Sequence, residues 1–598
     1  MNMFKNFYLK IIRFLKMKNK EKVIILKKKF LFLLKRILNK FNIQRILIKR
    51  YGAYFYLFND EISDGIFCGS YEADELRMLL NLININKNIN FLDIGANLGF
   101  YSIILGKFLE KSASNYRVIS IEPSPREFDR LKKNLEVNNL KNVILSNIAL
   151  SDLNDRLNFF IASNKTGHSS LEKPEEDSSS QIIVNTMKLD DFLKKIKIEK
   201  VDIMKIDVEG AELKVLNGGA ETFKKYKPLL MIEVSDKRTL KFNYKAQDIL
   251  NFLKNFGYKF FIIKKGYLTN LEGKNLYDDN VFAIPEEKIE DYFYLLEKPP
   301  SFITFVTTPK PFKDFIKIIQ YNAIKSWILL KPKTEIILVG DEYGVKDTTK
   351  EFDLKNIFEI AKNQYGTPLI NDIFEKAQNL STHNIICYLN TDIILNQKFI
   401  DVIIDIIREI KLKFSDKKFL IIGRRTDLKI DNLIDFEKNW EEEIFKRAKK
   451  EGKLLLSGID FFVFEKGFFK SLPPFNLGRG EWDNYLVFKA LKEKAIVVDI
   501  TDEVAVVHQF HGYQHHPFGE KMVGNGPEEI ENMNYAREVP HRYQIFDAPY
   551  KFYKGKLKLN LIGKFQIKSS FYRLLDFTRP IREKLFLTKG KIKKLIKQ

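Results

Sequence analysis

Apolar residues in the first half of the chain occur as short runs separated by segments of helical periodicity. The runs fall at 91–94, 118–122, 143–145, 201–206, 229–234, 259–263 and 281–284, and helical patterns occupy 100–108 and 125–138. Short buried strands that alternate with helices are typical of a mostly parallel sheet covered by helices on both faces. We therefore predict an open α/β domain that ends near residue 285, with the polar stretch 163–180 as a surface loop.

A second alternation of the same kind begins after a break. The break spans 285–300, where an acidic helix-like stretch ends in Lys298-Pro299-Pro300, and the next apolar runs fall at 302–307, 335–339, 385–389, 419–423, 459–464 and 495–500. A chain of 598 residues is long enough for two or three domains. The predicted fold class is α/β, with two tandem domains at 51–290 and 300–520 between a helical segment at 1–50 and an extension at 521–598.

The first candidate site follows the first predicted strand. That strand runs from Asp93 into Gly95-Ala96-Asn97-Leu98-Gly99 and then into a helix. Glycines let a backbone turn tightly and approach a ligand, and a helix start presents unpaired N–H groups. Glu122 ends the next strand, where a carboxylate can accept hydrogen bonds from both ribose hydroxyls. The spacing is not that of a dinucleotide fingerprint, so we predict S-adenosylmethionine rather than NAD, held by Asp93, Gly95, Asn97, Gly99 and Glu122.

Further carboxylates follow the fourth predicted strand, in the segment Lys205-Ile206-Asp207-Val208-Glu209-Gly210-Ala211-Glu212. Open α/β sheets bind ligands at the carboxyl ends of their strands. We expect Asp207 to be functional and Glu212 to be a helix-start carboxylate that satisfies backbone groups.

Residues 91–285 resemble an FkbM-type methyltransferase domain. The matching segments cover nearly the whole domain in order: 93–99, 121–123, 147–152, 167–171, 189–192, 206–212 and 280–285. The resemblance implies a class I S-adenosylmethionine fold and O-methylation, often of a hydroxyl on a sugar or natural product. It does not identify the acceptor.

Methyl transfer requires an acceptor oxygen held in line with the methyl group, and a nearby base can take the hydroxyl proton. Asp207 and His168 are the candidate bases. A solvent-exposed loop histidine is an equally good interpretation of His168, and no metal cluster is evident in this half of the sequence.

The second candidate site begins at Asn390-Thr391-Asp392, directly after the run 385–389. A carboxylate at such a strand end can hold Mg²⁺ or Mn²⁺ against a nucleotide-sugar diphosphate, although a turn with a helix cap is the alternative. Four of the seven histidines lie within 508–516. We predict His508 as a second ligand to the metal that Asp392 holds, with a zinc site as the alternative.

Two acids open a later predicted helix and complete this candidate site. They are Glu481 and Asp483, within Gly478-Arg479-Gly480-Glu481-Trp482-Asp483-Asn484, and we predict Asp483 as the base that activates an acceptor hydroxyl. If the site is real, these acids, Asp392 and His508 should line one cleft at the carboxyl end of the second sheet.

Residues 300–520 resemble a GT-A glycosyltransferase domain, with Asn390-Thr391-Asp392 in the place of its Asp-x-Asp motif. The resemblance implies a nucleotide-sugar donor and a sugar or glycan acceptor. Asn390 replaces the first aspartate, so metal dependence stays open. Arg424 and Arg425 could supply cations for phosphates, with plain surface charge as the alternative.

Charge is concentrated at the two ends of the chain. Residues 1–50 carry 16 Lys and Arg against the single acid Glu21, and residues 551–598 carry 15 against two acids, although the whole chain has a net charge of only +23. The middle is therefore slightly acidic, which argues against a nucleic-acid groove. No run reaches the ~18–20 apolar residues that span a bilayer, so the basic amphipathic ends are expected either to lie on an anionic membrane surface or to pack on the protein itself.

The cysteine content points to a reducing compartment. Two cysteines cannot form a disulfide framework, so we predict a cytoplasmic protein, peripheral to the membrane if its ends bind lipid. The resulting interpretation is a bifunctional enzyme of surface polysaccharide or glycan synthesis, an O-methyltransferase fused to a sugar transferase. The rival interpretation is a membrane-associated scaffold or binding protein with a degenerate second domain.

Overall fold

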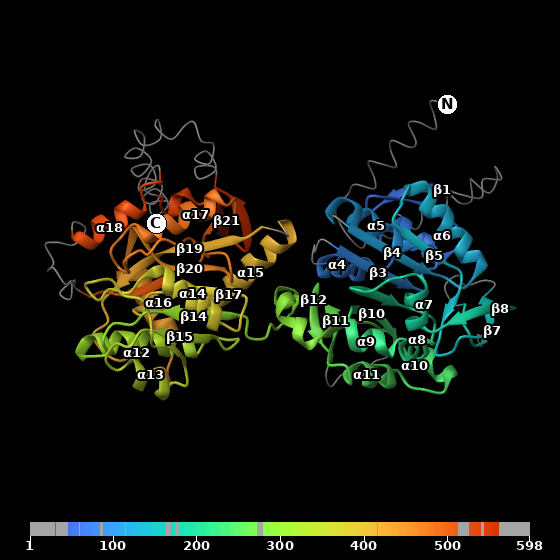
Figure 1. Cartoon of the computed structure of the whole chain (residues 1–598), viewed down its shortest axis with the longest axis horizontal. Coiled ribbons are helices and arrows are strands. Elements are labelled where there is room, and N and C mark those ends of the chain that lie inside the picture. Colours follow the sequence, from blue (N-terminus) through green and yellow to red (C-terminus); the bar gives the residue numbers. More distant parts are fainter. Residues whose placement is uncertain are drawn as a thin grey trace, which may run out of the picture. The chain divides into compact units, whose positions relative to one another are not determined.

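The computed structural model describes residues 30, 46–58, 60–83, 88–113, 115–162, 169–173, 179–271, 279–414, 417–511, 526–539 and 543–560. The chain divides into two compact units, Met1–Glu297 and Lys298–Gln598. Figure 1 draws the first unit in blue to green and the second in yellow-green to red. Each unit is built on its own mixed sheet, so the predicted α/β class is confirmed.

The first unit contains an eight-stranded sheet within its described residues, in the order β12-β11-β13-β10-β9-β3-β4-β5. Strands β5, β4, β3, β9 and β10 are parallel, and β13 is antiparallel to both β10 and β11. The strands fall where the apolar runs predicted them: β3 Asn88–Ile94, β4 Asn115–Ile121, β5 Val143–Ser146, β9 Ile203–Ile206, β10 Leu229–Val234, β11 Tyr258–Lys264 and β13 Asp279–Pro285, followed at the edge by β12 Tyr267–Asn270.

Helices cover both faces of this sheet (Figure 1). One face packs on α7, α8, α9 and α11 through a shared core that includes Phe192, Val215, Phe223 and Ile249. The other face is covered by α5 and α6. The bounds are α3 Glu61–Cys68, α4 Ala73–Leu82, α5 Phe100–Ser112, α6 Pro125–Asn138, α7 Leu189–Lys195, α8 Glu212–Gly218, α9 Ala220–Tyr226, α10 Asp236–Thr239, η1 Leu240–Phe242, α11 Ala246–Lys254 and η2 Glu286–Leu295.

Strands β3 and β9 are parallel neighbours at the centre of the sheet, and the order in which strands are added to the sheet reverses between them. After β3 the chain continues through α5 to β4 on one side, and after β9 it continues through α8 and α9 to β10 on the other side. Loops that diverge in this way leave a crevice at the carboxyl ends of the two strands, which is where open α/β sheets bind ligands.

Two smaller sheets flank the main one. Strands β1 Ile46–Arg50 and β2 Ala53–Leu57 form an antiparallel hairpin, so the prediction of a helical segment over 1–50 is wrong for 46–50, where exposure alternates with the period of a strand. The side chains of Asn134 and Asn138 on α6 accept hydrogen bonds from β2 amides. Strands β6 Ala149–Leu150, β7 Arg156–Ala162 and β8 Ser179–Met187 form a three-stranded sheet. Most of the loop predicted at 163–180 lies outside the described residues, and its last two residues begin β8.

The second unit contains an eleven-stranded sheet within its described residues, with the main path β16-β15-β14-β17-β20-β19-β21-β23-β24; β22 joins it beside β19 and also pairs with β18. The bounds are β14 Ile303–Thr307, β15 Glu335–Val339, β16 Lys355–Ile357, β17 Ile385–Leu389, β18 Ile393–Ile394, β19 Phe419–Leu428, β20 Lys453–Glu465, β21 Ile496–Asp499, β22 Val506–Gln509, β23 Tyr550–Tyr553 and β24 Lys556–Leu559. The helices are α12 Asp314–Ile328, α13 Val345–Glu351, α14 Ile370–Leu380, α15 Gln397–Lys413, α16 Trp440–Glu451, α17 Trp482–Lys492, α18 Pro527–Tyr535 and η4 Ile545–Asp547.

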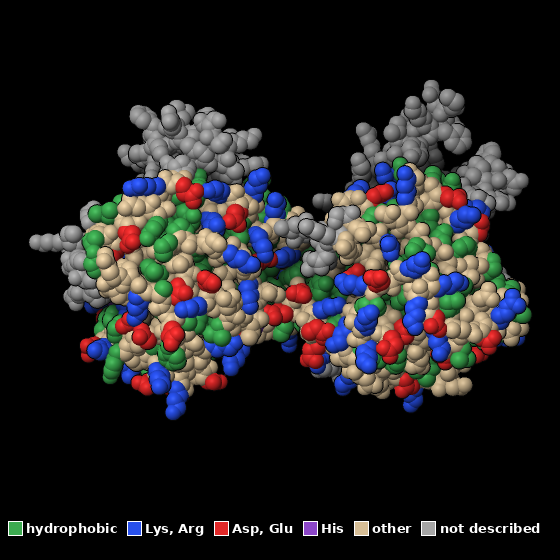
Figure 2. Space-filling model, in the orientation of Figure 1, with side chains coloured by type: hydrophobic (Ala, Val, Ile, Leu, Met, Phe, Trp, Pro, Cys, Tyr) green, Lys and Arg blue, Asp and Glu red, His purple; other side chains and the backbone are tan. Residues whose placement is uncertain are grey.

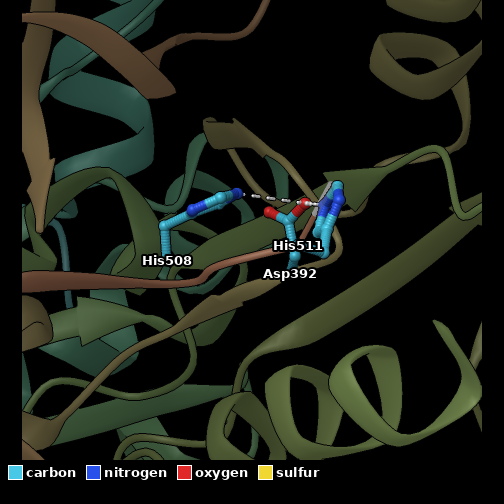
Figure 3. A group of neighbouring side chains, drawn as sticks. All are labelled: Asp392, His508 and His511. Atoms are coloured by element: carbon cyan, nitrogen blue, oxygen red, sulfur yellow. Dashed lines mark hydrogen bonds and ion pairs between the residues drawn. The ribbon is translucent and has the colours of Figure 1, made fainter. Parts of the chain in front are cut away.

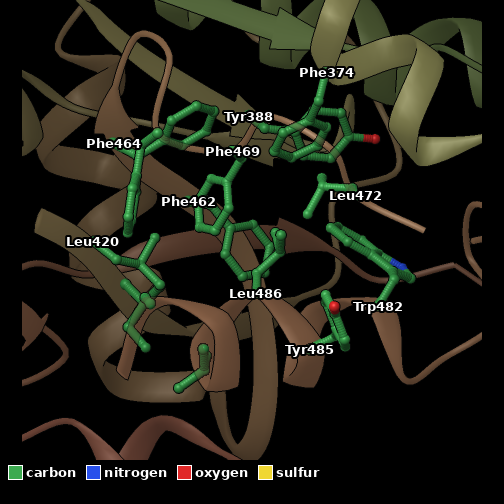
Figure 4. Packing of buried hydrophobic residues seen from close by; sticks show 14 of the residues in the cluster. Phe374, Tyr388, Leu420, Phe462, Phe464, Phe469, Leu472, Trp482, Tyr485 and Leu486 are labelled. Carbon is green, nitrogen blue, oxygen red and sulfur yellow. The ribbon is translucent and has the colours of Figure 1, made fainter. Parts of the chain in front are cut away.

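Aromatic side chains fill the core between this sheet and helices α14 and α17 (Figure 4). Phe374 stacks on Phe464 with ring centroids 5.5 Å apart, and Trp482 meets Tyr388 edge to face at 5.7 Å. Pairs of this kind add about 0.5–1.5 kcal/mol each to the burial of apolar area. Trp482 is the first residue of α17, so this packing fixes the start of that helix beside the end of β17.

The second unit extends beyond the predicted boundary at residue 520. Strand β23 pairs in parallel with β21, and β24 pairs with β23. Phe552 is buried, so part of the predicted extension at 521–598 belongs to the sheet. The prediction failed because β23 and β24 have only four residues each and contain lysines between their apolar positions, which masks their strand pattern.

Candidate active sites

A cavity of about 780 Å³ opens at the crevice of the first unit and is bordered by Gly95, Asn97, Glu122 and Asp207. Gly95 has φ of 78°, and a Cβ there would lie 1.8 Å from the carbonyl oxygen of Asp207. Only glycine therefore lets the loop after β3 lie directly against the loop after β9. The structure thus brings four of the predicted residues, from three strand ends, around one cavity.

Glu122 is held in place by backbone groups. Its carboxylate accepts hydrogen bonds from the N–H of Asn97 at 2.8 Å and from the N–H of Ser124 at 2.9 Å. Only 6% of the residue is exposed, and burial raises the pKa of Glu122 to about 8. The carboxylate is thus fixed at the cavity wall, where it can accept hydrogen bonds from a ligand.

Asp93 and Gly99 lie behind the loop rather than in the cavity lining. Asp93 is completely buried, and its carboxylate accepts hydrogen bonds from the N–H and the hydroxyl of Ser102 in the first turn of α5. A Cβ at Gly99 would lie 2.4 Å from Leu131, so this glycine lets α5 and α6 pack closely. Both residues therefore shape the loop from behind.

Asp207 forms an ion pair with Lys205, whose Nζ lies 3.0 Å from the carboxylate and also donates to the carbonyl oxygen of Gly95 at 3.2 Å. Burial alone would raise the pKa of Asp207, but the Lys205 ammonium and a hydrogen bond from it hold that pKa below its ordinary value. A carboxylate with a lowered pKa is a weak proton acceptor. Asp207 is therefore better suited to orient Lys205 and the glycine loop than to take a proton.

The other two predictions near this cavity have different outcomes. Glu212 accepts hydrogen bonds from the N–H groups of Val208 and Gly210, which is the structural role expected for it. His168 lies outside the described residues.

In the second unit, a cavity of about 1400 Å³ is lined by Asp392, Glu481, Asp483 and His508. The four residues that the sequence predicted to share a cleft therefore do so. Strand β18 pairs with β22 with Ile393 opposite His508, and this register brings Asp392 beside that histidine.

Asp392 lies between two imidazole rings (Figure 3). Its Oδ2 atom is 3.6 Å from Nε2 of His508 and 3.1 Å from Nε2 of His511. Burial alone would raise the pKa of Asp392, but the two histidines hold it well below its usual range. The ligand atoms of these residues lie within 4.8 Å of one another, so a divalent cation could bind all three. His511 is a further ligand candidate, and nothing in the sequence distinguishes it from the other histidines of the cluster.

Neighbouring polar groups orient this trio. Nδ1 of His508 lies 2.9 Å from Asp427, which leaves Nε2 directed at Asp392. Carboxylate partners of this kind orient the histidine ligands of metals. Arg425 makes ion pairs with Asp427 at 3.0 Å and with Asp460 at 3.0 Å.

The same network accounts for Asn390 in the place of an aspartate. Its amide Nδ2 donates a hydrogen bond to Asp460 at 2.7 Å. An aspartate at this position would place two carboxylates oxygen to oxygen, so the amide is the group that fits here. Asn390 thus anchors the loop after β17. Asp392 faces the histidines, and Asn390 does not.

The remaining predicted residues of this site are divided between the cavity and the protein interior. Arg425 lines the cavity, whereas Arg424 is buried and is not among the lining residues. Glu481 has φ of 63°, a conformation that costs a non-glycine residue about 1 kcal/mol or more and that is common at functional sites. The strained residue directs the backbone from Gly480 into α17, which places Asp483 at the cavity edge.

Comparison with known proteins assigns the first unit. Residues 93–260 match the Methyltransferase FkbM domain family. The chain is 30% identical over 211 residues to the 2-O-methyltransferase NoeI of Sinorhizobium fredii, covering 33% of this chain and 83% of that protein. It is 29% identical over 150 residues to the hexuronic acid methyltransferase AglP of Haloferax volcanii, covering 25% of this chain and 56% of that one.

Among solved structures, S. aureus TarS in complex with UDP-GlcNAc is similar at 11% identity with a TM-score of 0.27, over 40% of this chain and 67% of that one. A TM-score this low supports no conclusion about fold or activity. The match over 93–260 and the identity with NoeI over most of its length do: the chain belongs to the FkbM methyltransferase family, and the protein is a methyltransferase.

Proposed function

We propose that the first unit transfers a methyl group from S-adenosylmethionine to a hydroxyl group of a sugar or glycan. The observation that carries the proposal is the cavity between β3, β4 and β9, in which the Gly95 loop faces Glu122. The names of the relatives support the acceptor class, since one is a 2-O-methyltransferase and the other a hexuronic acid methyltransferase.

The residues around the cavity fit S-adenosylmethionine. Gly95 leaves room where a Cβ would collide with the backbone, and Glu122 presents a fixed carboxylate to the two ribose hydroxyls. When bound, the sulfonium compound supplies the activated methyl group. The protein's own contribution is to hold the acceptor oxygen in line with that methyl group and to provide a group for the hydroxyl proton.

The test combines binding with a screen of acceptors. Calorimetry of the full chain should show binding of S-adenosylmethionine and S-adenosylhomocysteine, and incubation with simple glycosides and uronic acids should give products heavier by one methyl group. NAD is the control ligand. Binding of NAD in place of the two sulfur compounds would contradict the proposal.

We propose a second activity, nucleotide-sugar transfer, for the second unit. It is favoured by the arrangement of Asp392, His508 and His511 beside Asp483 in one cavity, with Lys310 and Arg425 near the same carboxylate. A divalent cation on Asp392 and the histidines would neutralise a diphosphate, and the basic side chains would add to that charge. Asp483 would then take the proton of the acceptor hydroxyl, in a unit separate from the methyltransferase site.

Manganese binding tests this second activity. Titration of the full chain with Mn²⁺ alone, followed by electron paramagnetic resonance, should show one site that is lost in Asp392→Ala and weakened about tenfold or more in His511→Ala. His383→Ala is the matched control, because His383 lies against Glu335 and Thr304. Hydrolysis or transfer of a sugar nucleotide that survives Asp392→Ala would place the chemistry elsewhere.

A further inference from the structure

The cavity of the first unit continues past the glycine loop to a segment outside the matched family region. Tyr71 and Glu72, which precede α4, line it together with Tyr101 of α5. This part of the wall lies next to Lys205 and Asp207. It therefore borders the region where an acceptor would meet the methyl group if the ribose lies at Glu122.

Glu72 occupies this wall in a strained backbone conformation. It is the N-cap residue of α4 and has φ of 39° and ψ of 42°, in the left-handed region. A non-glycine residue in this region costs about 1–3 kcal/mol and persists where the surrounding structure requires it. Here the conformation turns the chain between Tyr71 and α4. Tyr71 is anchored by edge-to-face contact with Phe100 at 5.1 Å.

Two buried polar groups in this wall face each other, the Glu72 carboxylate and the hydroxyl of Tyr101, and within the described part of the chain neither Glu72 Oε2 nor that hydroxyl makes a hydrogen bond of ordinary geometry. Tyr101 is only 3% exposed, and its ring lies 5.5 Å from the Lys205 ammonium. Both residues line the cavity, so a polar ligand group there can bond to the pair. A hydroxyl group can both donate to the carboxylate and accept from the phenol.

Five charged or titratable groups face Glu72. They are Lys205 on β9, Asp207 after it, Tyr101 on α5, Tyr71 before α4 and Glu75 on α4. Burial raises the pKa of Glu72, Lys205 offsets part of this effect and Asp207 adds to it. The pKa of Asp207 is lowered instead, so of the two carboxylates Glu72 is the stronger base.

We propose that Glu72 is the general base of methyl transfer and that Glu72 and Tyr101 together bind the acceptor hydroxyl. The proposal rests on the O-methylation proposed above and adds the groups that select and deprotonate the acceptor. It assigns a catalytic residue 21 positions before the region that matches the family.

The acceptor oxygen forms a bond to the methyl carbon, and the carbon–sulfur bond breaks with its electron pair remaining on sulfur, which becomes a neutral thioether. The hydroxyl proton passes to the Glu72 carboxylate and from there to solvent. The Tyr101 hydroxyl donates to the acceptor oxygen and keeps it in line.

The experiment compares Glu72→Gln with Asp74→Asn, the same loss of charge at an exposed residue of α4 that pairs with Arg77 and lies outside the cavity lining. On a hydroxyl acceptor that the wild type methylates, Glu72→Gln should lower kcat about 10²–10⁴-fold and abolish the rise of activity with pH, whereas Asp74→Asn should keep both. Tyr101→Phe should raise KM for the acceptor about three- to tenfold. Calorimetry should show an unchanged Kd for S-adenosylmethionine in Glu72→Gln.

The protonation of the Glu72 carboxyl group can be measured independently of activity. Difference infrared spectra of wild type minus Glu72→Gln should show a carboxyl that loses its proton above the ordinary range of glutamate, and titration within that range would overturn the assignment. The assignment would also be overturned if Glu72→Gln kept the wild-type kcat, whether its binding of S-adenosylmethionine was unchanged or weakened. The wild type alone tests the underlying function, because an N-methyl or C-methyl product would contradict O-methylation whatever the variants do.

Discussion

Glu122 combines two properties that together determine how it should bind a ribose. Two backbone N–H groups fix its carboxylate, and burial raises its pKa to about 8. Ribose hydroxyls donate to the ionised form, and this form is the minor one at neutral pH because the pKa is raised. The affinity for S-adenosylmethionine should therefore increase as the pH rises toward 8.

This gives a prediction for Glu122→Gln. The variant should bind S-adenosylmethionine at least tenfold more weakly at pH 8.5, because each charge-assisted hydrogen bond contributes about 1.5–3 kcal/mol. Calorimetry at pH 6.5, 7.5 and 8.5 should show a strong pH dependence of Kd in the wild type and a weak one in the variant. Equal slopes for both proteins would mean that another group controls binding.

The Asp207–Lys205 pair makes a prediction about stability. The pKa of Asp207 is lowered, so the pair stabilises the fold above the unfolded-state pKa and this contribution is lost as the pH falls through the lowered value. Asp207→Asn leaves a buried ammonium with less compensation and should cost toward the lower end of about 3–5 kcal/mol at pH 7, since Asp93 and Glu72 remain near Lys205. Chemical denaturation of the wild type and the variant measures this loss in the free energy of unfolding.

The control is Asp74→Asn, which breaks the exposed ion pair with Arg77 and should cost less than about 1 kcal/mol. If Asp207→Asn lost no more stability than Asp74→Asn, the buried Asp207–Lys205 pair would not stabilise the first unit.

The loop after β3 is the element on which the first site depends. Gly95→Ala would push a Cβ into the backbone of the loop after β9 and should abolish measurable binding of S-adenosylmethionine as well as reducing stability. Gly266→Ala is the matched control, since Gly266 also has a positive φ of 85° but nothing lies within 4 Å of its Cβ position. It should cost only roughly 1 kcal/mol of conformational energy and leave binding intact. Normal binding of S-adenosylmethionine by Gly95→Ala would show that the loop after β3 is not part of the binding site.

Strands β19 and β22 determine the second site in a similar way. They pair in parallel with Asp427 opposite His508, and this register lets the carboxylate orient the imidazole. Asp427→Asn should weaken Mn²⁺ binding about 10–100-fold, as measured by electron paramagnetic resonance, whereas Asp435→Asn on the exposed loop before α16 should not. Unchanged affinity in Asp427→Asn would exclude it as an orienting partner.

The sequence predicted elements well where burial is on two faces and poorly where it is not. Central strands such as β3, β9 and β17 are continuous apolar runs, which is why the sheets and their strand-end residues could be located. The β1–β2 hairpin, β23 and β24 have mixed or exposed patterns, so they were missed. Asp207 lies at the strand end where the sequence suggested a functional carboxylate, but a sequence does not show that Lys205, two residues before it, pairs with it. Glu72 carries no motif and becomes visible only through its position at the cavity.

At the scale of the whole molecule, the charge distribution of the sequence leads to a prediction about membranes. In the part of the chain described by the structure, no helix is long and apolar enough to cross a bilayer. On the surface seen in Figure 2, Lys and Arg side chains are interspersed with Asp and Glu over both units, whereas the two basic ends lie almost entirely outside the described residues. The two ends are therefore the segments whose charge favours attraction to anionic lipid.

We expect the full chain to co-sediment with vesicles that contain anionic lipid, and binding should weaken as salt increases. Deletion should stop at residue 45, because Ile46–Arg50 is strand β1 and its loss would damage the first unit. Equal pelleting with neutral vesicles, or none with anionic ones, would contradict a peripheral membrane role.

The central claim is that the first unit methylates a sugar hydroxyl. The most direct measurement is the fate of the methyl carbon when the full chain is given S-adenosylmethionine labelled with ¹³C in its methyl group together with a glycoside or uronic acid acceptor. Nuclear magnetic resonance of the product should show the label as a methyl ether on a sugar carbon, formed by the wild type and at least a hundredfold more slowly by Glu72→Gln. Label on a nitrogen or a carbon of the acceptor would contradict the account.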